Sequence, residues 1–379
     1  MIYDVIVAGL GPAGATAAYE TGRRGLAVLG IDKSLHPRYK TCAGGLSTRI
    51  DKILSSDFHG LIEKKIMGIH FTYQGKEDLV VFSPSPIAYL VTRSRFDLHL
   101  VDKARKAGVE VREEEKIVAV RETDDYVEVE TTSARYRGRV LVGADGANGI
   151  VSKQIGRRRV GKAVPAIESD VEVDQKTLDG IGDKVLIDFG GIPGGYIWIF
   201  PKRDTLSVGM AGFKGKVDLP GHFDKFQKEN VIVKGLDLPK PKGYPIPVFH
   251  PPGSRVSKGR ILLAGDAANL VDPFFGEGIY YAVWSGQLAA NSIAEALGKN
   301  MPDLSSYDER VRSEIYPELA IAARLSYFIY SFPKLWFKAT QEYDEIIELY
   351  YQVLRGEMNY QDLMKGVKRL TEQFLDMVI

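Results

Sequence analysis

Short runs of apolar, mostly β-branched residues mark the pattern of the first part of the chain. Residues 2–8 and 26–31 are runs of this kind and predict buried parallel strands. The small residues of 13–25, which lie between them, predict a helix. Two later runs, 139–146 and 259–268, repeat the pattern, and each contains an Asp next to a Gly. The order of strand, helix and strand predicts a Rossmann-type α/β domain assembled from distant segments.

A second pattern is the alternation of apolar and polar positions. Residues 68–73 and 79–82, separated by a glycine turn, predict a β-hairpin. Residues 195–202 and 207–209 predict two more strands joined by a turn. A period of two places three aromatic side chains on one face of the first of these strands: Tyr196, Trp198 and Phe200.

The chain after residue 300 contains almost no glycine and has helical spacing, with a break expected at Pro317. Nine of the 25 residues from Tyr327 to Tyr351 are aromatic, against 10% of the whole chain. Two arrangements would concentrate aromatic residues in this way. One is a seam between packed helices. The other is a helical wall that completes a lipid tunnel or rests on a membrane interface, where Tyr and Trp favour the boundary.

Composition narrows the classes of protein. Among 379 residues, 45% are apolar and 26% are charged, and the net charge of +1 gives no support to nucleic-acid binding. The single cysteine excludes an intramolecular disulfide, and the six histidines lack ligand spacing, so we expect no metal site. No apolar run is long enough to span a bilayer, and residues 2–8 do not resemble a signal peptide. We expect a cytoplasmic protein, with peripheral contact at the inner face of the membrane as a further hypothesis.

The loop after the first strand carries a complete G-x-G-x-x-G sequence at residues 9–14. Gly9 allows the tight turn, Gly11 lets the backbone approach a pyrophosphate, and Gly14 lets the helix pack closely on the strand. Asp32 ends the second strand at the distance typical of a carboxylate that accepts hydrogen bonds from ribose hydroxyls. Strand, loop, helix and acid together predict a dinucleotide site.

Asp145 and Asp266 indicate which dinucleotide binds. A carboxylate at the end of a buried strand suits hydrogen bonding to the polyol chain of a flavin. The helix after Gly276 and Gly278 would direct its positive end at the isoalloxazine ring. We therefore predict FAD as the cofactor. The residues expected to hold it are Gly9, Gly11, Pro12, Ala13, Gly14, Asp32, Lys33, Asp145, Gly265, Asp266, Gly276, Gly278 and Ile279.

These segments, spread from residue 9 to residue 266, resemble the fingerprints of the flavoprotein monooxygenase-like superfamily. The sequence R-x-x-F-D-x-x-L, which begins at Arg93, resembles the arginine segment of that superfamily and implies that Arg93 lies near the flavin. The segment at Asp145 departs from the usual sequence at Asn148-Gly149 and at Ser152.

Two further motifs are more specific. Residues 37–45, P-x-x-K-x-C-A-G-G, and residues 196–201, Y-x-W-x-F-P, resemble the geranylgeranyl reductase family, and the resemblance extends from residue 1 to about residue 300. It implies an FAD-dependent enzyme that saturates isoprenoid double bonds in archaeal lipids, (bacterio)chlorophyll side chains or polyprenyl quinones. It also implies that one loop lies beside the isoalloxazine, formed by Cys42, Ala43, Gly44 and Gly45. Flavin-dependent halogenases have a W-x-W-x-I-P sequence similar to the second motif, but the first motif is not part of their pattern.

An isolated alkene is a poor hydride acceptor, because no carbonyl group polarises it. Its reduction needs protonation of the neighbouring carbon or a transition state with carbocation character, and aromatic faces around a dry cavity favour such a state. We expect Tyr196, Trp198 and Phe200 to line the substrate pocket, with Tyr196, Trp198 and Cys42 in catalytic roles. The alternatives are ordinary core packing for the aromatic residues and an inert, buried role for the cysteine.

The predicted organisation has three regions. An FAD-binding domain comprises residues 1–60, 92–160 and 255–300, an inserted α+β substrate domain comprises residues 61–91 and 161–254, and residues 301–379 form a C-terminal helical region.

The main functional hypothesis is hydride transfer from N5 of the reduced flavin to a geranylgeranyl or polyprenyl chain. That chain would belong to a prenylated lipid, a chlorophyll-type molecule, a quinone or a prenyl diphosphate. A monooxygenase of an aromatic or lipid substrate and a flavin electron-transfer partner are the alternatives. The sequence has no second G-x-G-x-x-G, which leaves the external reductant open among NADPH, a deazaflavin and a ferredoxin. The sequence does not predict the oligomeric state.

Overall fold

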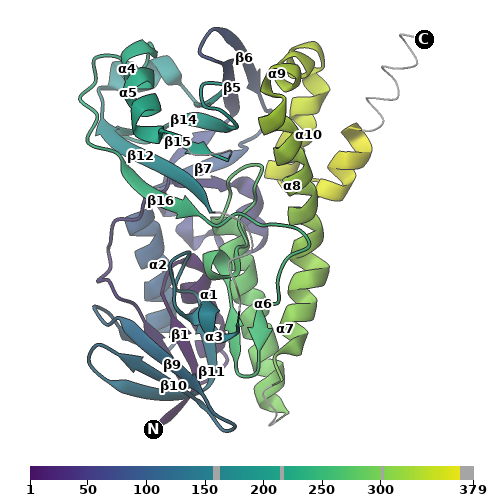
Figure 1. Ribbon diagram of the computed structural model, residues 1–379. Helices are drawn as coiled ribbons and strands as arrows, with labels where there is room; N and C mark the ends of the chain where they lie inside the picture. The colour runs from purple at the N-terminus through teal and green to yellow at the C-terminus, as the bar shows by residue number, and fades with distance from the viewer. Residues whose placement is uncertain (157–162, 214–216, 300–302, 368–379) are drawn as a thin grey trace. The chain divides into compact units, whose positions relative to one another are not determined.

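The computed structural model describes residues 1–156, 163–213, 217–299 and 303–367 (Figure 1). The chain divides into two compact units, each made of three segments. The first unit contains Met1–Lys40, Arg93–Ala163 and Ile246–Ala323. The second unit contains Thr41–Thr92, Val164–Pro245 and Arg324–Ile379. The first two and the last twelve residues of the predicted C-terminal helical region lie outside the described residues.

An eight-stranded sheet forms the centre of the first unit. At its middle β1 (Ile2–Ala8) pairs in parallel with β2 (Val28–Ile31) on one side and with β11 (Arg135–Gly143) on the other. The sheet continues through further strands at both ends: β18 (Ile261–Leu263), β17 (Ser257–Lys258) and β8 (Glu110–Arg112), with β9 (Ile117–Glu122) and β10 (Val127–Thr131) in an antiparallel meander on β11. The apolar runs predicted to be buried strands are buried strands of this sheet.

Three helices pack beside this sheet: α1 (Pro12–Gly22), which consists mainly of small residues, α2 (Arg93–Lys106) and α6 (Ile279–Gly298). Helix α1 contacts α6 and α2. The absence of a side chain at Gly286 permits the first contact, because a Cβ there would lie against the carbonyl oxygen of Ala13. Three short elements complete this part of the unit: α3 (Val151–Gln154), a 3₁₀ turn at Gly265–Ala268 and α7 (Ser305–Arg310).

The second unit is built on a seven-stranded sheet with the order β16-β12-β15-β14-β13-β5-β6. Its strands are β5 (Gly68–Tyr73), β6 (Glu77–Phe82), β12 (Val164–Glu172), β13 (Lys184–Phe189), β14 (Gly195–Pro201), β15 (Thr205–Gly212) and β16 (Lys242–Ile246). The two predicted hairpins are confirmed, since β5 pairs with β6 and β14 pairs with β15 in antiparallel registers. A small sheet of three strands lies in the same unit: β3 (Gly45–Ser47), β7 (Ala88–Val91) and β4 (Ile62–Ile66), with 3₁₀ turns at Thr48–Lys52 and Ser56–Leu61.

The two faces of the large sheet differ. Ile197 and Ile199 of β14 enter an aliphatic core that also includes Leu178 of α4 (Gln175–Ile181) and Phe223 of α5 (Leu219–Glu229). The alternate residues of β14 point away from this core. The rings of Tyr196 and Trp198 lie 5.7 Å apart, centroid to centroid, on the opposite face. The prediction that the aromatic residues share one face is confirmed.

The C-terminal helices differ from the prediction at one residue. Helix α7 continues through a π-helical turn, Val311–Ile315, into α8 (Tyr316–Ser331), so Pro317 lies within a continuous helical segment and does not break it. A proline at the start of α8 is tolerated because the wider turn before it relaxes the usual hydrogen-bond pattern. The actual break precedes Pro333, the first residue of α9 (Pro333–Glu342), and α10 (Asp344–Leu354) follows.

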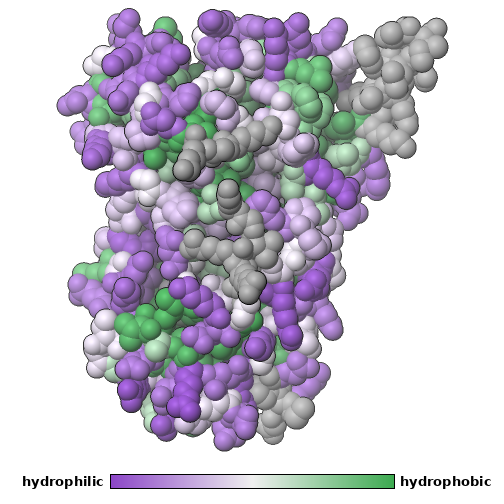
Figure 2. Space-filling model, in the orientation of Figure 1, coloured by the Kyte–Doolittle hydropathy of each residue, from purple (hydrophilic) through white to green (hydrophobic). Residues whose placement is uncertain are grey.

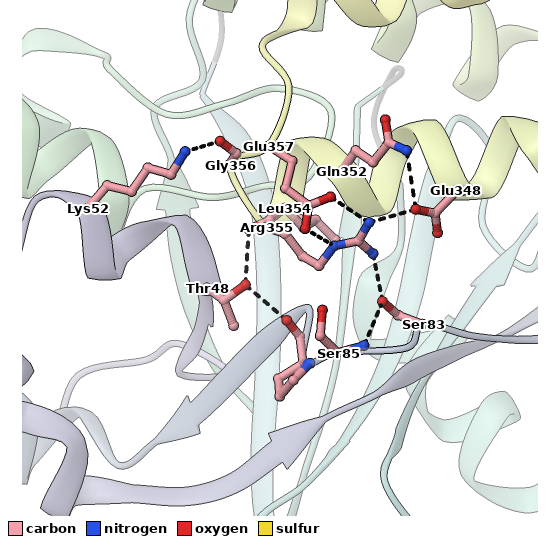
Figure 3. A network of polar contacts seen from close by, with 11 residues as sticks. Thr48, Lys52, Ser83, Ser85, Glu348, Gln352, Leu354, Arg355, Gly356 and Glu357 are labelled. Carbon is pink, nitrogen blue, oxygen red and sulfur yellow. Dashed lines mark hydrogen bonds and ion pairs between the residues drawn. The ribbon is translucent and has the colours of Figure 1, made fainter.

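Arg355, just after α10, holds this helix on the rest of the second unit (Figure 3). Its guanidinium donates to Ser83 at 2.6 Å, to Glu348 at 2.6 Å and to Glu357 at 2.7 Å. Lys52 donates to the carbonyl of Gly356. Tyr351 of α10 accepts from the backbone N–H of Ile69 and donates to the carbonyl of Val81, which fastens α10 to the β5–β6 hairpin.

The compact units divide the chain differently from the predicted domains in several places, among them residues 246–254, which we assigned to the substrate domain and which lie in the first unit. Residues 41–60, which we assigned to the FAD-binding domain, lie in the second unit, because β3 pairs with β7 there. The predicted C-terminal region is shared, since the first unit ends inside α8 at Ala323. The functional domain boundaries stay a prediction. Among the described residues, no helix combines the length and apolar character needed to cross a membrane.

Candidate active site

The glycine loop of the first unit has the geometry of a phosphate cradle. Gly9 has a φ of +88°, which a residue with a side chain rarely adopts. At Gly14 a Cβ would collide with the carbonyl oxygen of Gly9, so the close approach of helix and loop requires glycine. Gly11, by contrast, precedes the first turn of α1 and faces open space, with only the Arg38 guanidinium 3.7 Å from the position of a Cβ. The loop therefore leaves room for a group at Gly11.

Asp32 stands at the end of β2 as predicted. One carboxylate oxygen accepts from the N–H of Leu10 at 2.8 Å, and the other accepts from the N–H of Ser34 at 2.9 Å. The carboxylate thus ties the second strand to the glycine loop. Each oxygen keeps a second lone pair, which suits the predicted bond from a ribose hydroxyl.

Asp97 organises two arginines beside this loop, and we did not anticipate this cluster from the sequence. Arg93 forms a bidentate pair with the Asp97 carboxylate, at 2.9 and 3.0 Å, and Arg38 approaches the same carboxylate at 3.3 Å. Asp97 is fully buried. A carboxylate held between two guanidiniums fixes both of them, and it places Arg38 next to Gly11. The i, i+4 spacing of Arg93 and Asp97 signalled their pairing, but the arrival of Arg38 from a distant loop had no local signal.

Asp145 has the environment of a ligand-binding carboxylate. Its Oδ2 accepts from the backbone N–H groups of Ile150 and Val151, whereas its Oδ1 is buried without a hydrogen-bond partner among the described residues. Burial raises the pKa of this carboxyl group, and the positive charge of Lys33 acts in the opposite direction. A buried oxygen with an open acceptor site suits a hydroxyl donor from a bound molecule.

The Gly265–Asp266 segment meets the glycine loop in the same unit. The position of a Cβ on Gly265 lies 2.8 Å from the Ala13 side chain, so this contact also requires glycine. Gly276 has a φ of +65° and Gly278 precedes Ile279, the first residue of α6, so the start of this helix lies where we predicted it. The described residues therefore fit an FAD, because they provide a glycine cradle with an arginine beside it, the carboxylate of Asp32 at the end of β2, and a buried oxygen of Asp145 with an open acceptor site.

The remaining predicted site residues gather in the second unit. The Cys42–Gly45 loop leads into β3, and the Cys42 sulfur accepts from the N–H of Gly44 at 3.4 Å. Gly44 has a φ of +76°, and a Cβ there would overlap the carbonyl of Val91. The position of a Cβ on Gly45 lies 3.0 Å from the Phe200 ring. The cysteine loop and the aromatic strand are thus neighbours, although about 150 residues separate them in the sequence.

A helical residue completes the aromatic face. The Tyr330 ring of α8 stacks on Tyr196 with a centroid distance of 5.9 Å and on Phe213 with a centroid distance of 4.4 Å. Trp198 donates from its indole nitrogen to Ser207 at 3.5 Å. Tyr196, Phe213 and Tyr330 form a stack in which both sheet and helix take part. This stack supports the packed-seam alternative for part of the aromatic segment.

Glu168 is a second residue that we did not anticipate. It lies on β12, opposite Gly209 of β15, and Gly209 in turn lies opposite Trp198 of β14. Directly opposed residues of antiparallel strands share a face, so Glu168 belongs to the aromatic face. A Cβ on Gly209 would overlap the Trp198 indole, which shows that the ring extends over the glycine toward β12. Glu168 is 2% exposed, and the next acid on this face, Asp170, is paired with Lys202 at 3.4 Å.

Comparisons with known proteins agree with this site. Residues 2–189 match the model of an FAD-binding domain family. An uncharacterized protein of Methanosarcina barkeri is 30% identical over 357 residues, which cover 93% of this chain and 90% of that protein. A digeranylgeranylglycerophospholipid reductase of Methanosphaerula palustris is 30% identical over 346 residues, which cover 82% of each chain. The solved structure of a geranylgeranyl bacteriochlorophyll reductase-like protein from Thermoplasma acidophilum has the same fold, with a TM-score of 0.79 at 21% identity over 97% of this chain and 99% of its own.

The fold and the glycine cradle define an FAD-dependent oxidoreductase. The chain belongs to the geranylgeranyl reductase family, whose members act on carbon–carbon double bonds. The predicted family, fold class and cofactor are thereby confirmed. The roles predicted for individual site residues stay predictions.

Proposed function

We propose that this protein saturates isolated double bonds in the geranylgeranyl chain of a membrane lipid or its precursor. The observation that carries the proposal is the aromatic face of β14, which lies against the Cys42–Gly45 loop through Phe200 and Gly45. The relative from M. palustris, whose name specifies reduction of a digeranylgeranylglycerophospholipid, supports a lipid substrate. The external reductant that restores the hydride is NADPH, a deazaflavin or a ferredoxin.

Bound FAD, when reduced, supplies the hydride. The protein must then hold the alkene, exclude water and stabilise positive charge on the carbon that does not receive the proton. The faces of Tyr196 and Trp198 can do all three, because aromatic rings attract cations and bind apolar chains. We assign Cys42 to the wall beside the alkene, where its small, polarisable side chain packs without a fixed charge.

A proton is the other requirement of the reaction, and Glu168 is our candidate for its source. Glu168 is buried on the same face as Trp198, so its carboxyl group, when it carries a proton, can deliver that proton inside the wall and away from bulk water. The glycine at position 209 leaves no side chain between Glu168 and the Trp198 ring. In the proposed step the π bond breaks, one alkene carbon gains the proton of Glu168 and its neighbour gains the hydride. Solvent then returns a proton to the carboxylate, and the external reductant would replace the spent hydride as two electrons and a proton.

The test is the mass of the product formed from a geranylgeranylated glycerophospholipid. The purified FAD-loaded protein is reduced with dithionite and incubated with the lipid, once without oxygen and once in air. We expect the lipid to gain pairs of hydrogen atoms, and no oxygen, in both arms. Gain of an oxygen atom only in air would establish a monooxygenase instead. An unchanged lipid, together with no stabilisation of the protein by prenyl lipids in thermal unfolding, would favour an electron-transfer protein.

A further inference from the structure

The outer side of α8 and α9 carries a band of exposed apolar residues. Tyr327 is 72% exposed, Phe328 is 42% exposed, Phe332 is 53% exposed and Leu335 is 57% exposed. The rings of Phe328 and Phe332 lie 5.8 Å apart, so the band continues across the break between the helices. Figure 2 shows hydrophobic residues at the surface over α9. Large apolar side chains that gather on a surface are typical of a binding site.

The charges along the same segment have one sign. From Arg324 to Lys338 the exposed residues are the four apolar residues of this band and three cations: Arg324, Lys334 and Lys338. No Asp or Glu occurs between Glu318 and Glu342. We call this set of seven residues the basic–aromatic face. Arginine and lysine interleaved with large apolar residues are typical of helices that lie in a membrane interface.

The opposite side of the same helices is firmly packed, so the exposure does not come from a loosely held segment. Ile329, Trp336 and Phe337 are buried, and the Trp336 ring contacts Tyr350 of α10 at 5.2 Å. Tyr330 stacks on Tyr196 of the aromatic strand. A rigid helix pair that presents one apolar side to solvent can enter a lipid headgroup layer without losing its own core contacts.

We propose that the basic–aromatic face docks the protein on the surface of a bilayer that contains anionic lipids. The three cations complement negative headgroups, and the aromatic residues enter the boundary between headgroups and acyl chains. A second copy of this chain is a poor occupant, since two such faces would bring cations together. The inference goes beyond the proposed function, although Tyr330 connects the docking helices to the proposed substrate wall.

Co-flotation of the full-length, FAD-loaded protein with vesicles tests the proposal. We expect binding to vesicles of phosphatidylcholine mixed with phosphatidylglycerol, and at least tenfold weaker binding to phosphatidylcholine alone. The variant Lys334→Glu/Lys338→Glu should lower binding to the anionic vesicles more than tenfold, and Phe332→Asp/Leu335→Asp should do the same. All four positions are exposed, so both variants should keep their FAD spectrum and melting temperature.

Matched controls come from the same unit. Lys225→Glu/Lys228→Glu changes two exposed lysines on α5, and Val231→Asp changes an apolar residue that is exposed after α5. Neither control should affect vesicle binding. Equal loss in a control and in its matched variant would overturn the proposal, as would equal binding to both kinds of vesicle. A dimer that Phe332→Asp/Leu335→Asp converts to a monomer would also overturn it. Turnover of detergent-dispersed lipid should be unchanged in all variants, which separates docking from catalysis.

Discussion

Two glycines of the same loop perform different tasks. Gly14 is needed by the protein itself, because a side chain there would strike the carbonyl of Gly9. Gly11 faces open space, so the fold itself does not require glycine there, and we propose that the bound cofactor does. Substitutions at the two glycines should therefore have different effects, on folding at Gly14 and on cofactor binding at Gly11.

We expect Gly11→Ala to leave the apoprotein at least as stable as the wild type and to weaken FAD binding more than tenfold. The added methyl group fits the empty protein but occupies the place of the diphosphate, and an alanine at a compatible backbone angle stabilises by about 0.4–1 kcal/mol. Gly298→Ala, at the open end of α6, is the matched control: it should stabilise the apoprotein to a similar extent and leave FAD binding unchanged. Flavin fluorescence titration and thermal unfolding of the apoprotein measure the two effects. Parallel loss of stability and affinity would contradict this division of tasks.

Glu168→Gln should slow alkene reduction by about 10²–10⁴-fold, the usual contribution of a general acid. Glutamine keeps the shape of the side chain but cannot release a proton in the reaction. Flavin content, dithionite reduction and stabilisation by prenyl lipid should be unchanged. Glu172→Gln, the same change at an exposed position of β12, should have the wild-type rate. Single-turnover kinetics across pH measure both. A wild-type rate and pH profile for Glu168→Gln would remove Glu168 from the reaction.

At the scale of the elements, the attachment of α10 to the second unit depends strongly on Arg355, the residue that follows the helix. The Arg355 side chain is 7% exposed and serves three acceptors, whereas its two glutamate partners are 40% and 51% exposed. The glutamates hold the pKa of the guanidinium above its usual value, and Arg355 holds the pKa of Glu357 below its own. In this network the buried guanidinium of Arg355 therefore pairs with two glutamates that remain in contact with solvent.

Arg355→Ala should lower the free energy of unfolding by about 2 kcal/mol, since charged hydrogen bonds are lost but solvent screens the glutamates. Lys365→Ala removes an ion pair with Asp362 in which both side chains are exposed, and it should change stability by less than about 0.5 kcal/mol. Urea unfolding of the two variants gives the comparison. A difference below the experimental error would show that the other contacts of α10, such as those of Tyr350 and Tyr351, hold the helix without Arg355.

A tyrosine in the three-stranded sheet of the second unit predicts that the folded protein loses stability at alkaline pH. Tyr89 of β7 donates to Asp51 at 2.8 Å, and burial together with this bond raises the pKa of Tyr89 to about 12. The folded protein binds this proton more tightly than the unfolded chain, whose tyrosines titrate near pH 10. The stabilisation is therefore complete below pH 10 and is lost as the pH rises through 12. The difference in melting temperature between wild type and Tyr89→Phe should narrow over this range. A difference independent of pH would contradict the assignment.

At the scale of the whole molecule, local periodicity predicted most of the elements. The strand, glycine loop and helix at the N-terminus and the alternation at 195–201 are found as expected, because each depends on neighbours a few residues apart. What escaped prediction depends on distant pairing. Glu168 joined the aromatic face only through the register of β12 with β15, and Arg38 joined Asp97 from another segment. Pro317 was misjudged because the π-helical turn that accommodates it has no sequence signature.

The interleaving of the two units has a consequence for biosynthesis. Each unit consists of three segments, so the chain passes from one unit to the other five times, and the last passage falls inside α8. The glycine loop leaves the ribosome more than 250 residues before α6, so helix α1 must wait for this packing partner. The second unit can complete its fold only after α10 has been synthesised. The nascent chain thus exposes apolar strand faces until its distant partner segments have been made, and neither unit can complete its fold before its third segment has left the ribosome.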